Sequence, residues 1–106
     1  MSAESLEELR VDLLVCGKHA LVALRGEIDF SNRAQLEAPL VTAVRDGDDV
    51  TIDLAQVAFM DIGSVQLIVE TATKLARDGR RLTGVHPQSG VRRVFTLLDA
   101  DHLLRP

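Results

Sequence analysis

The stretch VAFMDIGSVQLIVETATKLARDG, residues 57–79, changes at Asp61 from the pattern of a strand to that of a helix. Aspartate is a preferred helix N-cap, because its carboxylate accepts hydrogen bonds from the free backbone N–H groups of the first turn. We therefore predict a helix that begins at Asp61 and stops at Gly79. After Asp61, apolar residues recur at helical intervals on one stripe: Val65, Ile68, Val69, Ala72, Leu75 and Ala76.

The residues before this stretch predict three strands and one helix. Two apolar runs, residues 10–16 and 19–25, are joined by Gly17 and Lys18 and read as an antiparallel hairpin. Residues 33–47 space their leucines and valines as a helix does, with Pro39 expected to kink this helix or delay its start. Residues 48–57 have the β-branched content of a central, buried strand.

After residue 79, one further strand is predicted over residues 80–86 and an amphipathic helix over residues 89–100. The order of elements predicts an α/β fold, in which helices pack against a small mixed β-sheet. With 106 residues and 46% hydrophobic content, the chain suits a single domain over residues 1–106, with residues 1–9 as a possible short N-terminal extension.

Composition argues against several classes of partner. The formal net charge of −4 disfavours nucleic acid, which is bound through clustered cations. No apolar run approaches the roughly 20 residues that span a bilayer, and the acidic N-terminus does not resemble a secretion signal, so we expect a cytoplasmic protein with no membrane contact. The one cysteine, Cys16, lies in an apolar run and is expected to be buried and inert.

Catalytic and metal-binding motifs are missing from the sequence. His19, His86 and His102 lie far apart and share no ligand spacing with Cys16, so we predict no metal site. The glycines form no phosphate-binding motif, and no serine lies in a nucleophile elbow. We therefore predict no cofactor and no enzymatic activity.

Two acidic groups admit a functional and a structural interpretation. The cluster Asp46, Asp48 and Asp49 is most simply a solvated loop tip. The segment GEIDFSN, residues 26–32, carries Glu27, Asp29 and Ser31 and is interpreted as a polar loop that meets a partner, although turn and capping duties explain it almost as well.

Ser64 lies in the first turn of the helix that follows Asp61. The positive end of the helix dipole is beside it, so this place tolerates added negative charge. Phosphorylation would add a charge of about −1.5 to −2 there. The alternative is that Ser64 is a structural residue of the first turn.

The sequence resembles a known family, the STAS domain, which is shared by sulfate transporters and anti-sigma factor antagonists. The resemblance covers nearly the whole chain, and its most specific parts are the GEID turn and DLAQVAFMD followed by a helix. It implies the STAS-like (SpoIIAA-like) fold. A stand-alone domain of this size resembles the bacterial antagonists, which bind an anti-sigma factor that is a serine kinase and so regulate transcription.

The sequence departs from that family at one position. Phosphorylated antagonists read Asp-Ser-Ser-Gly, with the first serine modified, whereas this chain has Asp61, Ile62, Gly63 and Ser64. Ile62 therefore occupies the phospho-acceptor position and has no hydroxyl to modify. Ser64 aligns with the glycine and should emerge about 200° around the helix from residue 62, which favours its structural role over a substitute phosphosite.

A second stripe on this helix, Ser64, Leu67, Thr71 and Lys74, is expected to lie away from the main apolar face. Leu67 would then be a partner contact, or simply a single exposed leucine. The leading hypothesis is a binding protein for an anti-sigma factor or serine kinase, and the sequence makes no prediction of its oligomeric state. Its expected contacts are Glu27, Asp29, Ser31, Asp61, Gly63, Ser64, Leu67 and Thr71.

Two other hypotheses remain open. Some STAS proteins are accessory subunits or scaffolds in lipid-transport or signalling assemblies, and the sequence is compatible with that role. A module that binds a small apolar or anionic ligand would use the helix N-terminus at Gly63 and Ser64. No convergent set of polar residues supports the latter.

Overall fold

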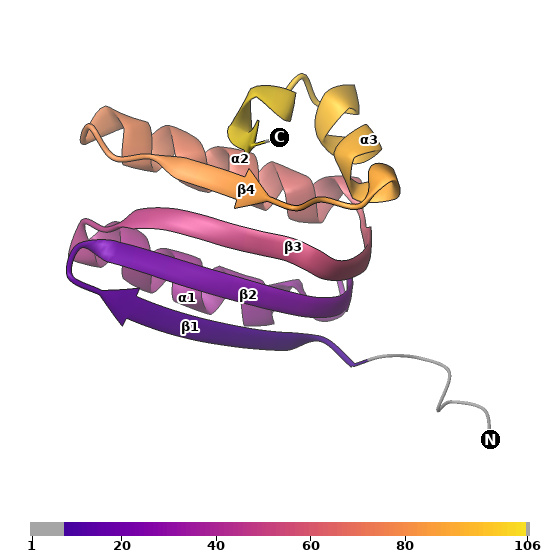
Figure 1. Cartoon of the computed structure of the whole chain (residues 1–106), viewed down its shortest axis with the longest axis horizontal. Helices are drawn as coiled ribbons and strands as arrows, with labels where there is room; N and C mark the ends of the chain where they lie inside the picture. The colour runs from indigo at the N-terminus through magenta and orange to yellow at the C-terminus, as the bar shows by residue number, and fades with distance from the viewer. Residues whose placement is uncertain (1–7, 106) are drawn as a thin grey trace.

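The computed structural model describes residues 8–105, and Figure 1 shows their arrangement. The elements follow one another along the chain as β1 (Arg10–Cys16), β2 (His19–Ile28), α1 (Arg33–Asp46), β3 (Asp49–Met60), α2 (Ile62–Arg77), β4 (Leu82–Val85), α3 (Ser89–Leu97), the short 3₁₀ helix η2 (Asp101–Leu103) and β5 (Leu104–Arg105). The predicted α/β order is confirmed. Residues 1–7 of the expected N-terminal extension lie outside the described residues.

The five strands form one mixed sheet in the order β1-β2-β3-β4-β5. β1 and β2 are antiparallel, and every later pair is parallel. The predicted hairpin is confirmed, with Cys16 opposite His19 across the two-residue turn. Figure 1 shows α1 and α2 side by side behind the sheet, with α3 beyond β4. The strand predicted to be central, β3, lies in the middle of the sheet.

The core lies between the sheet and the two helices. Strand residues that point to the helices alternate with exposed ones, as in Ala20, Val22 and Leu24 of β2. The helices complete this layer with a buried stripe each: Leu36, Leu40 and Ala43 on α1, and Val65, Ile68 and Leu75 on α2. α3 adds the buried Val91 and Phe95. This packing holds the ends of β2 and β3 and the starts of α1 and α2 in one place.

The expected ends of two strands are wrong: β3 runs through Met60, three residues past the predicted end at residue 57, and β2 also continues beyond its predicted end at residue 25. β2 continues through Ile28, because Gly26 and Ile28 pair with β3 and are buried, so the GEI residues belong to the strand and not to a loop. The predicted range of α1, residues 33–47, is confirmed, since the helix runs from Arg33 to Asp46 with Gly47 as its C-cap, and Pro39 inside it does not delay its start. Leu36 and Leu40, which are buried on either side of Pro39, offset the one backbone hydrogen bond that proline cannot make.

Three burial predictions are also wrong. Cys16 is exposed, because β1 is the edge strand and α1 barely contacts it. Ala76 is exposed near the end of α2. Asp48 is buried and not at a solvated loop tip, since its backbone N–H donates to the Ala43 carbonyl and turns the chain back toward the sheet. No helix among residues 8–105 has the length and apolar character needed to cross a membrane.

Candidate functional site

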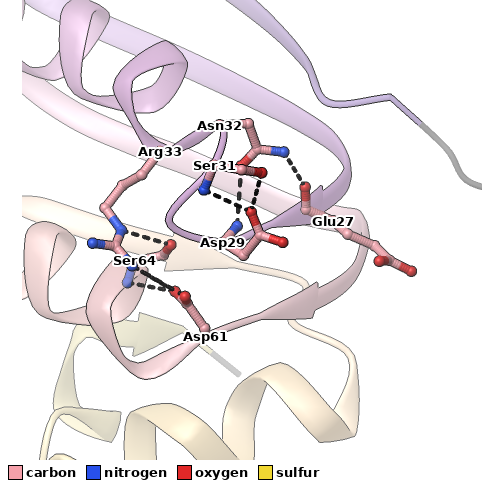
Figure 2. Close-up of polar contacts among 7 residues, drawn as sticks. All are labelled: Glu27, Asp29, Ser31, Asn32, Arg33, Asp61 and Ser64. Atoms are coloured by element: carbon pink, nitrogen blue, oxygen red, sulfur yellow. Dashed lines mark hydrogen bonds and ion pairs between the residues drawn. The ribbon is translucent and has the colours of Figure 1, made fainter.

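The candidate site lies where β2 and β3 end and lead into α1 and α2. The two strands are parallel, so their carboxyl ends meet at one edge of the sheet, the place where open α/β sheets present their functional loops. Figure 2 shows the polar side chains that gather there from the end of β2, the β2–α1 loop and the starts of α1 and α2.

Asp61 caps α2, as the sequence predicts. Its Oδ1 accepts a hydrogen bond of 2.8 Å from the backbone N–H of Ser64, and its carbonyl accepts one from Val65. Its backbone is extended, with φ −79° and ψ 169°, which is the conformation of an N-cap. The cap at Asp61 therefore fixes where α2 begins, and it also fixes the backbone position of Ile62, the next residue.

Arg33, the first residue of α1, joins the two helices. Its Nη2 donates to Asp61 Oδ2 at 3.0 Å and to Oδ1 at 3.3 Å, while its Nε donates to Ser64 Oγ at 3.2 Å (Figure 2). Arg33 was not predicted from the sequence as a site residue. One signal was present: a cation in the first turn of a helix opposes the helix dipole and needs an anionic partner.

Gly63 makes room for the Arg33 guanidinium. A Cβ placed on Gly63 would lie 2.7 Å from Arg33 Cζ, closer than such atoms approach in proteins, and 3.0 Å from Nη1, which is a tight contact. The guanidinium therefore lies over the backbone of the first turn of α2. Any residue with a Cβ at position 63 would fill the space that the guanidinium occupies. This is the role the structure assigns to Gly63.

The carboxyl of Asp61 is stabilised in its charged form. Partial burial raises its pKa, but the hydrogen bonds from the side chain and backbone of Ser64, together with the charge and hydrogen bond of Arg33, lower the pKa by more. The net pKa lies below the ordinary value, so the ion pair with Arg33 is fully formed at neutral pH.

The β2–α1 loop is held by its own side chains. Asp29 Oδ1 accepts from the backbone N–H of Ser31 at 2.9 Å and from its hydroxyl at 2.6 Å, and both bonds lower the Asp29 pKa. Asn32 accepts from the Asp29 backbone N–H and donates from Nδ2 to the Glu27 carbonyl at 2.9 Å. The Glu27 carboxylate points away from this network (Figure 2). Turn-forming duties thus account for Asp29, as the alternative interpretation holds.

The predicted exposed stripe on α2 is wrong for Ser64 and Thr71, whereas Leu67 is half-buried and Lys74 is exposed. Ser64 has an exposed fraction of 0% and Thr71 of 5%, and the Thr71 hydroxyl donates back to the Leu67 carbonyl of its own helix. Leu67 packs against the core and lines a groove of about 400 Å³ between α1 and α2. The reason is that α2 is covered by α1 as well as by the sheet, so its buried arc is wider than its apolar stripe.

Three large apolar side chains at this end of the sheet are exposed instead: Phe30 by 82%, Phe59 by 48% and Ile62 by 49%. Phe30 follows β2, Phe59 lies opposite Glu27 in the β2–β3 ladder, and Ile62 begins α2. We call these three residues the apolar rim. Of these three residues only Ile62 was predicted from the sequence to matter, although the apolar run AFM, residues 58–60, at the end of β3 was a visible signal for Phe59.

Within the described part of the chain, no three side chains of the His, Cys, Asp and Glu types are grouped so that they could hold a metal ion. The site therefore consists of a polar network closed on itself and an apolar rim beside it. Such an arrangement provides a surface for binding.

A family model described as "Mlab, STAS domain" matches residues 16–106 of this chain. No curated protein matches the sequence. Among solved structures, the fold is similar to that of an anti-sigma factor antagonist from Mycobacterium paratuberculosis, with a TM-score of 0.82, 24% identity, and coverage of 93% of this chain and 86% of that chain.

Two further structures extend the comparison. The anti-sigma factor antagonist SpoIIAA in its unphosphorylated form matches with a TM-score of 0.79 and 22% identity, over 92% of this chain and 86% of that chain. SLC26A9 matches with a TM-score of 0.65 and 12% identity, over 84% of this chain but only 18% of that much longer chain. At these identities the likeness shows the fold, and the predicted SpoIIAA-like architecture is confirmed.

Proposed function

The chain belongs to the STAS domain family, and on that premise we propose that it is a non-catalytic regulator of the anti-sigma factor antagonist type, which acts by binding a protein partner. The partner we propose is an anti-sigma factor that is also a serine kinase. Two of the structural neighbours described above are antagonists of anti-sigma factors, which supports this class of partner.

The observation that carries the proposal is the apolar rim. Phe30, Phe59 and Ile62 come from three separate segments and are exposed at the same end of the sheet. Large exposed apolar residues that gather beside a polar network are typical of protein interfaces, in which a few aromatic and aliphatic anchors supply most of the binding energy. Asp29, Ser31 and Glu27 border this surface as its polar margin.

We further propose that binding is not controlled by phosphorylation at the family's usual position. Ile62 occupies that position and has no hydroxyl. The nearest hydroxyl in the same turn, that of Ser64, is fully buried and accepts a hydrogen bond from Arg33. A kinase would have to open the contact between α1 and α2 before it could reach this oxygen.

Binding is tested with the purified chain and the anti-sigma kinase of the same organism, by titration calorimetry. Ile62→Asp places a charge in the rim, and we expect the dissociation constant to rise about tenfold or more. Leu97→Asp is the control, because Leu97 is also a large exposed apolar residue, by 69% against 49% for Ile62, but lies on α3, outside the site. Equal affinity of the wild type and Ile62→Asp would exclude the rim as the docking surface.

Phosphorylation is tested by incubating the same two proteins with ATP and locating phosphate by mass spectrometry. We expect no phosphate on the wild type and modification of residue 62 in Ile62→Ser. Stoichiometric phosphate on wild-type Ser64, together with loss of binding, would show that the chain keeps a switch that the proposal denies.

A second candidate is an accessory subunit of a transport assembly. The matching family model carries the description "Mlab, STAS domain", and the fold also occurs as a small part of SLC26A9. Co-purification of the tagged chain separates the two candidates. A serine-kinase partner supports the first, and a transporter ATPase or a membrane component supports the second.

A further inference from the structure

β1 leaves one side of its backbone without a partner among the described residues. It is the outermost strand of the sheet, paired only with β2, and Figure 1 shows no described element beyond it. An exposed strand edge is a template for pairing with another strand, and proteins that remain monomeric usually block it with a proline, a bulge or inward-pointing charges. The β1–β2 register is continuous, and β1 contains no proline.

The hairpin geometry determines which backbone groups are free. The pair of Cys16 and His19 closes a two-residue turn, so these two residues exchange both backbone hydrogen bonds, and bonded pairs alternate from there along the ladder. Even-numbered residues of β1 therefore direct their N–H and C=O groups to β2. The odd-numbered residues direct theirs to the free edge: Val11, Leu13 and Val15.

The same three residues point to the side of the sheet that carries the helices. Leu13 lies opposite the buried Val22 and Val15 opposite the buried Ala20 in the ladder, yet Leu13 is 40% exposed and Val15 57% exposed. α1 reaches β1 at few places, so the apolar layer of the core continues past the helix and ends uncovered at the edge. The edge thus offers free hydrogen-bonding groups and apolar side chains on the same residues.

We infer that β1 pairs antiparallel with β1 of a second copy of this chain, about a two-fold axis at Leu13. In this register Leu13 lies opposite Leu13 of the second copy, and Val11 lies opposite Val15. Val11, Leu13 and Val15 of one copy then lie opposite Val15, Leu13 and Val11 of the other. Every free N–H and C=O group on the edge of β1 is therefore paired. The two sheets become one continuous sheet, and no other register of this edge pairs as many groups.

Side-chain chemistry supports a second copy as the occupant. On the helix side of the sheet, this register brings only Leu and Val side chains together, so Leu13 and Val15 of both copies become covered. A two-fold interface requires a patch that is complementary to itself, and an edge whose apolar and hydrogen-bonding residues are symmetric about Leu13 meets this condition. No residue of the apolar rim takes part in the pairing.

The oligomeric state of the full chain tests the inference by sedimentation velocity over a range of concentrations. We expect a monomer–dimer equilibrium, and we expect Leu13→Lys, which sets two like charges face to face on the axis, to raise the dissociation constant about tenfold or more. Leu97→Lys is the control for an added surface charge and should leave the equilibrium unchanged. A wild type that stays monomeric at every concentration would overturn the inference.

Disulfide trapping tests the register, in a Cys16→Ser background. Leu13→Cys should cross-link under mild oxidation, because paired Cα atoms at about 5.5 Å fall within the distance range of a disulfide. Leu14→Cys should not, since residue 14 faces Asp12 of the second copy. Thermal unfolding of each variant confirms that it is folded. Equal cross-linking at both positions, or at neither, would contradict the assigned pairing.

Discussion

Gly63→Ala should have opposite effects on stability in the presence and in the absence of the Arg33 side chain. Gly63 lies in the first turn of α2 without a positive φ, so alanine fits its backbone. In the wild type, however, the new Cβ would occupy the place of the Arg33 guanidinium. The guanidinium must move, and we expect this movement to break its contacts with Asp61 and Ser64.

The magnitudes decide the sign. Replacing glycine by alanine within a helix stabilises it by about 0.5–1 kcal/mol. Losing the Arg33–Asp61 pair, which is partly exposed, costs roughly 0.2–1 kcal/mol. Leaving the buried Ser64 hydroxyl without its donor costs about 1–2 kcal/mol more. The net expectation is a destabilisation of about 1 kcal/mol, or a fall in the melting temperature of about 4 °C.

In an Arg33→Ala background there is no guanidinium to displace, so the same substitution should stabilise the protein by about 0.5–1 kcal/mol. The four proteins form a double-mutant cycle with an expected coupling of about 2 kcal/mol between residues 33 and 63. Urea unfolding followed by circular dichroism measures all four. If Gly63→Ala stabilises both backgrounds equally, Arg33 does not lie over Gly63, and the account of the site is wrong.

Three further outcomes are expected. The folded state lowers the Asp61 pKa, so the charged carboxylate adds stability above its unfolded pKa, and this stability is lost as the pH falls. Asp61→Asn keeps a capping oxygen but has no charge, so it should be less stable than the wild type at pH 7. In acid titrations of unfolding, the variant should lose less stability than the wild type below about pH 4. Gly84→Ala should destabilise by about 1–3 kcal/mol in urea, since its Cβ would lie 2.9 Å from Leu104 Cδ2 and 3.2 Å from Leu54 Cδ1. Ser64→Ala should lower stability by about 1 kcal/mol while leaving partner affinity within about twofold in calorimetry, because this side chain is buried.

The helices, strands and turns that depend on a local sequence pattern were predictable from the sequence. The periodicity of α2, its cap at Asp61 and the hairpin turn at Gly17 depend on residues within a few positions of one another, and the structure confirms each. The mixed sheet followed from the order of these elements. Whether a strand lies at the centre or at the edge depends on contacts distant in sequence, which is why the exposure of Cys16 was predicted wrongly.

The candidate site was predictable in part. The cap at Asp61 was predicted from the sequence and is confirmed. Its position beside the β2–α1 loop was not predicted; it follows from the parallel pairing of β2 and β3, whose carboxyl ends meet at one edge of the sheet. The contacts of Arg33 span 28 and 31 positions, and no local pattern reports them. A helical wheel ranks residues by polarity alone, so it could not show that α1 covers Thr71.

The features of the first turn of α2 all fit a surface that a partner binds in one form only, without a phosphorylated and an unphosphorylated state. A residue with a side chain at position 63 would exclude the Arg33 guanidinium; with glycine there, the guanidinium neutralises Asp61 and engages the Ser64 hydroxyl. The charge on this turn is therefore balanced internally, and the exposed position 62 carries a hydrocarbon side chain. A partner that contacts the apolar rim therefore meets little net charge in the neighbouring turn. This favours apolar contact, because no unpaired cation or anion of the turn has to be desolvated. Under the proposed function, control of binding then rests with the amount of this protein or the state of its partner.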